Sequence, residues 1–183
     1  MQKLDWQLDG EWQPHSHSAV FTTEITSAGT ARLLAGVPVG DFCVPAQLIK
    51  CLAPPFFVLY VLHTPRGEGT PGRYQSPQLS GDELQAFLDR FASFFAGDSR
   101  FDLRVHSPAT KGTIVWDRHN LVYGYGPIEC FCEVLQSISF TDGVPIVPTP
   151  HAHHYRQQFD GDAKALLSMF PWQIFPLQPQ DEQ

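Results

Sequence analysis

The sequence has no run of lysine or arginine. Its 183 residues include 12 Lys and Arg but 19 Asp and Glu, which gives a formal charge of −7 at neutral pH. Binding of nucleic acid needs a concentrated positive surface, so this composition argues against a nucleic-acid partner. An acidic surface is compatible with a basic protein partner, because opposite charges steer association.

The sequence also lacks a long apolar stretch. Its longest apolar run covers residues 56–62, which is too short to span a membrane, and residues 1–6 contain no apolar core of signal-peptide length. We therefore expect no membrane partner. The four cysteines include Cys130 and Cys132, whose spacing is not the Cys-x-x-Cys of a zinc knuckle. We interpret all four as free thiols and expect a cytoplasmic location.

Several catalytic motifs are missing from the sequence as well. It contains no glycine-rich phosphate loop with lysine, no dinucleotide fingerprint, no Gly-x-Ser-x-Gly elbow and no His-Glu-x-x-His helix. No motif requires a cofactor. The sequence therefore carries no local signature of a catalytic site.

Aromatic residues and chain breakers are both plentiful, with 14 Phe, 4 Trp and 5 Tyr beside 16 Pro and 14 Gly. Aromatic side chains supply a large buried area, whereas frequent Pro and Gly divide the chain into short elements. These features predict a single α+β domain with a mixed sheet of five to six strands and two to four helices packed mainly on one face. We assign residues 1–18 to an N-terminal arm, 19–177 to the domain and 178–183 to a flexible tail.

The clearest helix signal is a capping box formed by Ser80 and Glu83, followed by apolar residues at helical spacing up to Phe95. The apolar run 56–62 predicts a strand covered on both faces, and residues 101–106 predict the next strand. Strand, helix and strand together suggest a right-handed crossover with a locally parallel pair. Further predicted elements are a strand at 19–26, a hairpin at 113–117 and 121–125 with Asn120 in the left-handed region, and helices at 45–52, from 127 and at 162–170.

Residues 64–79 predict a long irregular loop between the central strand and the helix. Loops of this length are often functional, and a helix N-terminus offers backbone donors to an anion. The hypothesis is a site for a protein partner or a small anionic ligand, in which the neighbouring hairpin turn takes part. The alternative is a solvated connection whose arginines pair with carboxylates. The candidate binding residues are His63, Arg66, Glu68, Arg73 and His119.

Histidines are concentrated in residues 148–155. His151 and His153 lie two apart, so an extended chain points both imidazoles to one side, where they can share a divalent metal such as zinc; His154 points away. The pair needs further ligands, and none follows at the spacing of a known motif. The alternative is that these rings pack or lie on a loop. The residues that could complete a metal site are His63, His106, Asp117 and His119.

Two classes of function remain open. The first is a non-enzymatic binding module, such as an immunity or regulatory protein, that uses the loop 64–79. The second is a histidine-based hydrolase, with or without a metal. Residues 117–120 are better explained as a turn than as a catalytic pair, since Asp and Asn are favoured in turns for backbone reasons.

Overall fold

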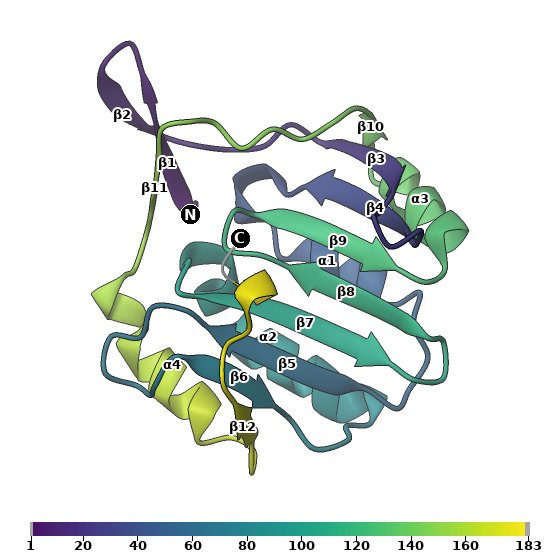
Figure 1. Ribbon diagram of the computed structural model, residues 1–183, viewed down its shortest axis with the longest axis vertical. Coiled ribbons are helices and arrows are strands. Elements are labelled where there is room, and N and C mark those ends of the chain that lie inside the picture. Colours follow the sequence, from purple (N-terminus) through teal and green to yellow (C-terminus); the bar gives the residue numbers. More distant parts are fainter. Residues whose placement is uncertain (1, 182–183) are drawn as a thin grey trace.

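A nine-stranded mixed sheet forms the centre of the computed structural model, which describes residues 2–181 (Figure 1). The predicted α+β class with helices on one face is confirmed, although the sheet has more strands than the five to six predicted. Its strands in spatial order are β10 (Thr141–Asp142), β3 (Val20–Ile25), β4 (Ala31–Gly36), β9 (Leu121–Tyr125), β8 (Gly112–Trp116), β7 (Phe101–Ser107), β5 (Phe57–Leu62), β6 (Gly72–Gln75) and β12 (Gln173–Phe175).

Helices cover one face of this sheet, and we call the opposite face the open face (Figure 1). The helix α2 begins with the predicted capping box, because Ser80 accepts from the backbone of Glu83 and the Glu83 carboxylate accepts from Ser80. Neighbouring strands are antiparallel apart from β10, which pairs in parallel with β3. The helices are α1 (Cys43–Ile49), α2 (Gly81–Gly97), α3 (Ile128–Ser137) and α4 (Asp160–Leu167), with 3-10 turns at Pro38–Gly40, Gln157–Phe159 and Pro179–Asp181.

The hairpin of β8 and β9 forms as predicted, with Asn120 in the left-handed region at φ 60°. The irregular loop predicted for 64–79 is wrong in part, because residues 72–75 form β6. This strand also overturns the predicted parallel pair: β5 and β7 are adjacent and antiparallel. The helix α2 instead connects β6 to β7, which flank β5 and run parallel to each other.

The N-terminal arm forms a small second sheet. Its strands β1 (Leu4–Leu8) and β2 (Glu11–Pro14) make a hairpin, and β1 pairs with β11 (His151–His153). Pairing of Leu4 with His153 and of Trp6 with His151 fixes where the histidine strand lies. The arm therefore helps to position the histidines.

The described part of the predicted C-terminal tail, residues 178–181, folds onto the open face. Its last turn ends at Asp181, which is 2 % exposed and accepts a hydrogen bond from Arg104 at 2.6 Å. These residues are therefore docked on the sheet. Residues 182–183 lie outside the part that the structure describes.

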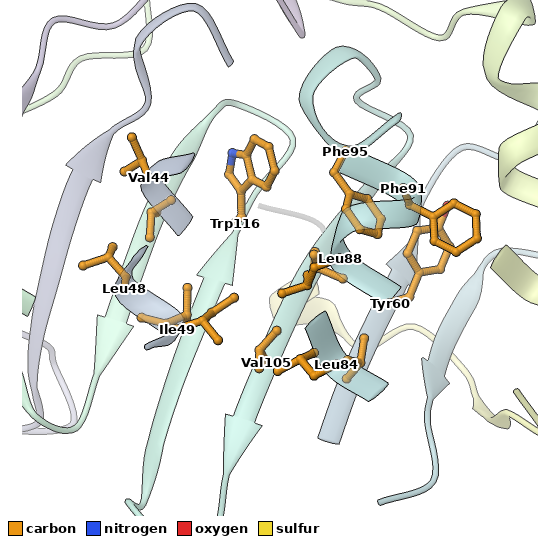
Figure 2. Packing of buried hydrophobic residues seen from close by; sticks show 14 of the residues in the cluster. Val44, Leu48, Ile49, Tyr60, Leu84, Leu88, Phe91, Phe95, Val105 and Trp116 are labelled. Atoms are coloured by element: carbon orange, nitrogen blue, oxygen red, sulfur yellow. The ribbon is translucent and has the colours of Figure 1, made fainter. Parts of the chain in front are cut away.

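The core lies between the sheet and α1–α3. Figure 2 shows Phe91 and Phe95 of α2 next to Tyr60 of β5, while Trp116 lies between α2 and α1. Both phenylalanines and Tyr60 are at most 1 % exposed. The phenylalanine stripe read from the sequence therefore faces the core.

A buried arginine joins the end of α2 to the rest of the molecule. The side chain of Arg100 is 0 % exposed and pairs with Asp98 at 2.9 Å, with Glu68 at 3.1 Å and with Asp160 at 3.0 Å. A buried charge is stable only when it is paired and hydrogen-bonded. The three carboxylates come from three segments, so Arg100 fixes these segments relative to one another.

The prediction of four free thiols is wrong, because Cys51 and Cys130 form a disulfide between the segment after α1 and the helix α3. The two residues are 79 positions apart, and a spacing of that size carries no local signal. Cys43 and Cys132 are free thiols. The argument from free thiols to a cytoplasmic location therefore loses its basis.

Within residues 2–181, the structure shows no helix that combines the length and apolarity needed to cross a bilayer.

Replacing Phe91 by Ala should lower the free energy of unfolding by about 3–5 kcal/mol, because a buried aromatic is lost and a cavity remains. Urea denaturation measures this value. The matched control is Phe175→Ala, since Phe175 is 45 % exposed and should contribute less than about 1 kcal/mol. Equal losses in the two variants would contradict the packing described for α2.

Candidate metal centre beside a pocket on the open face

Three histidines from two distant segments meet near one end of the open face. His119 lies in the turn between β8 and β9, while His151 and His153 project from the same side of β11. Their ring centroids are 5.3, 4.9 and 5.3 Å apart. One nitrogen from each ring lies within 4.8 Å of the other two. We call these residues the histidine cluster.

Hydrogen bonds fix two of these rings with one nitrogen free. Nδ1 of His151 lies 2.8 Å from the carbonyl oxygen of Pro148; a carbonyl can only accept, so Nδ1 donates and Nε2 keeps its lone pair. Nδ1 of His119 lies 3.3 Å from the Asp117 carboxylate, which assigns the same tautomer. Outer hydrogen bonds of this kind are typical of metal-binding histidines.

In His153, unlike the other two rings, Nδ1 is the nitrogen without a hydrogen-bond partner within residues 2–181. This Nδ1 is buried. A buried nitrogen without a partner costs free energy unless a ligand satisfies it.

The surroundings of His153 favour its neutral imidazole. Burial, followed by the neighbouring His119, Arg118 and His151, lowers the pKa of His153 to about 3. The neutral form is the one that binds a metal ion. The cluster can therefore accept a cation at neutral pH without first losing a proton from His153.

Asp117 is held in place by the backbone around it. Its Oδ1 accepts from the amides of His119 at 2.9 Å and of Leu121 at 2.8 Å. Behind it, the fully buried Lys3 donates to the Asp117 carbonyl at 3.1 Å. Burial lowers the pKa of Lys3 to about 8 against the opposing effect of Asp117. The carboxylate that orients His119 is thus built into the turn.

Two further histidines form a second layer. His17 donates from Nε2 to the carbonyl of His119 at 2.9 Å, and Nε2 of His15 lies 3.4 Å from Nδ1 of His17. Burial and, to a smaller extent, the nearby His17 and His151 lower the pKa of His15 to about 4. The sequence analysis did not identify this pair, although His15 and His17 lie two positions apart, as His151 and His153 do.

A pocket of about 770 Å³ opens on the open face beside the histidine cluster. It is bounded by residues of β4, β7, β8 and β9, by residues 147–151 and by the C-terminal turn. His119 and His151 lie at its wall together with Asp117. The other polar residues that line it include Arg32, Asp102, Arg104, Thr113, Tyr123, Tyr125 and Asp181.

The structure keeps two of the residues predicted to form a loop site together and separates the others. The amide of Arg66 donates to the Glu68 carboxylate at 2.6 Å, whereas His63, Arg73 and His119 lie elsewhere. His63 lies 3.0 Å from Asp102, Arg66 pairs with Asp160 at 3.1 Å, Glu68 pairs with Arg100 at 3.1 Å and Arg73 lies 3.5 Å from Asp181. Each side chain thus faces a different charged partner, as in the alternative of a connection with paired charges. His119 belongs instead to the histidine cluster.

Of the four candidates to complete a metal site, the structure brings two to the histidine cluster. His106 binds Thr113 at 2.9 Å and His63 binds Asp102, so neither takes part in the cluster. Asp117 orients His119, and His119 supplies the third nitrogen.

No known protein family, curated protein or solved structure matches this chain.

The low pKa of His153 predicts a pH effect on stability. In the unfolded chain this histidine has its ordinary pKa of 6.5, whereas in the folded protein its pKa is about 3. The protein therefore keeps the full contribution of His153 to its stability above about pH 6.5 and loses it as the pH falls toward about 3, because protonation favours the unfolded chain. In metal-free protein, His153→Gln removes the titrating group. Between about pH 7 and about pH 4, the free energy of unfolding of the His153→Gln variant should therefore fall less than that of the wild type.

Urea titrations across this range measure the effect, with the exposed His106→Gln as the control. Parallel losses in wild type and His153→Gln would mean that the imidazole is not held neutral.

Proposed function

We propose that the protein is a metal-dependent hydrolase whose histidine cluster holds a zinc ion. The observation that carries the proposal is the set of three imidazoles with one free nitrogen each: two are fixed by hydrogen bonds to Asp117 and Pro148, and the third has a buried nitrogen without a partner in the described chain. Nitrogen ligands of this kind suit zinc and related divalent ions.

The geometry is compatible with a tetrahedral ion. Nitrogens at about 2.0–2.1 Å from zinc lie roughly 3.3 Å apart, so rings whose nitrogens lie within 4.8 Å need only small movements. Three protein ligands leave a fourth position for water, which is the arrangement of catalytic rather than structural zinc sites. The pocket beside His119 and His151 supplies room for a substrate at that position.

Hydrolysis is the chemistry that such a centre performs most directly. Zinc lowers the pKa of bound water to about 7 and so supplies hydroxide at neutral pH. Asp117 orients His119, and the walls of the pocket position the bond to be cleaved. The binding module expected at residues 64–79 has weaker support, because Arg66 and Arg73 already face carboxylates.

Zinc titration tests the metal centre. The chain should bind one equivalent of zinc, and His119→Ala, His151→Ala and His153→Ala should each weaken binding at least about tenfold. His154→Ala is the matched control, since His154 is next in sequence but pairs with Asp5 at 2.9 Å. Equal effects in all four variants would contradict the assignment.

Activity is tested on the same proteins. Zinc-loaded wild type and His154→Ala should hydrolyse simple esters or amides, whereas His119→Ala should lose this activity. Tight zinc binding without hydrolysis of any such compound would reduce the centre to a structural metal site.

A further inference from the structure

The C-terminal segment, residues 173–181, crosses the open face of the sheet. It begins as β12, which pairs with β6 at the sheet edge, and Figure 1 shows the chain running in front of β5 and β7 to its last turn. Within these nine residues, which the structure describes completely, seven are exposed and Leu177 is partly buried. Asp181 alone among them is buried.

Beyond the paired strand β12, a charged residue anchors this exposed segment. Apolar burial normally fixes a chain end, whereas Ile174 and Phe175 remain 60 % and 45 % exposed. The Asp181 carboxylate, with a side chain 0 % exposed, instead enters the pocket and bonds to Arg104 at 2.6 Å. Residues 176–181, beyond β12, therefore rest on the open face mainly through one carboxylate.

The arginines that receive this carboxylate have unused donors. Nε of Arg104 and Nε of Arg73 are both buried without a hydrogen-bond partner in residues 2–181. Arg73 lies 3.5 Å from Asp181, which is close enough for charge attraction but too poorly aligned for a hydrogen bond. Two guanidinium groups thus share one carboxylate and keep donors for a second or better-placed anion.

These arginines lie near the histidine cluster. Arg73 on β6 and Arg104 on β7 flank β5, and Arg104 lines the same pocket as His119 and His151. Asp102, two residues before Arg104 on the same strand, accepts from the backbone of Arg118 at 2.9 Å, immediately before His119. One ligand of moderate size can therefore reach from Arg104 toward the metal position.

We infer that Arg104 and Arg73 form a carboxylate-binding subsite of the pocket, and that Asp181 occupies it in place of a substrate carboxylate. The inference rests on the proposed function and deepens it: the substrate is an ester or amide that carries a carboxylate group. Arginine suits this task because its planar donors match the two oxygens of a carboxylate. Binding of such a substrate displaces Asp181 and lifts residues 176–181 from the open face.

Succinate binding to metal-free protein tests the subsite independently of zinc. Asp181→Asn removes the internal carboxylate's charge but keeps its size, so succinate should bind this variant at least about tenfold more tightly than the wild type. Adding Arg104→Gln to Asp181→Asn should abolish the gain. The matched control is Asp89→Asn, the same change at an exposed position on α2, which should bind succinate like the wild type.

A second measurement follows the segment itself. Asp181→Asn should speed proteolytic cleavage within residues 176–180 relative to Asp89→Asn, and succinate should speed this cleavage in the wild type. Succinate affinity and cleavage rates that are the same in Asp181→Asn and Asp89→Asn would overturn the inference.

The proposed function can fail separately. If the subsite exists but the zinc site does not, Asp181→Asn gains succinate affinity while the wild type binds no zinc. If the zinc site exists without the subsite, zinc binds normally and Asp181→Asn shows no gain.

Discussion

Burial of the Arg100 guanidinium is the constraint on which the rest of the structure depends. Its charge is removed from water and must be neutralised, and Asp98, Glu68 and Asp160 do this from three segments. The adjacent Ser99 connects the same corner to the histidine cluster: its hydroxyl donates to the backbone carbonyl of Lys3 at 2.6 Å, and its amide donates to the carbonyl of His154 at 2.9 Å. The histidine strand and the N-terminal strand are therefore both attached to the corner that Arg100 holds.

The open face combines two kinds of chemistry that are far apart in the chain. Histidines 119 and 151, whose Nδ1 atoms are fixed by Asp117 and Pro148, join His153 as candidate metal ligands beside the pocket. Arg104 on β7, which lines the pocket, and Arg73 on β6 both face the Asp181 carboxylate. Helices cover the opposite face, so the core and the site do not compete for the same side chains: along β7, Leu103 and Val105 are buried while Arg104 lines the pocket.

Local signals in the sequence predicted elements well where each residue's reason is local. The capping box of Ser80 and Glu83, the phenylalanine stripe of α2 and the left-handed Asn120 depend on neighbours within one or two turns. The strand β6 was missed because its four residues lie among Pro, Gly and charges, and only pairing with β5 and β12 makes them extended. That omission led directly to the wrong parallel pair.

The sequence by itself determined the α+β class, the apolar face of each long element and the fact that His151 and His153 share one side of an extended chain. Tertiary structure alone decided which third histidine joins them, which cysteines pair and which acids meet Arg66, Arg73 and Arg100. The physical reason is range. Side-chain periodicity is set by backbone geometry a few residues long, whereas contacts between positions 119 and 153, 51 and 130, or 104 and 181 exist only after the sheet order brings distant segments together.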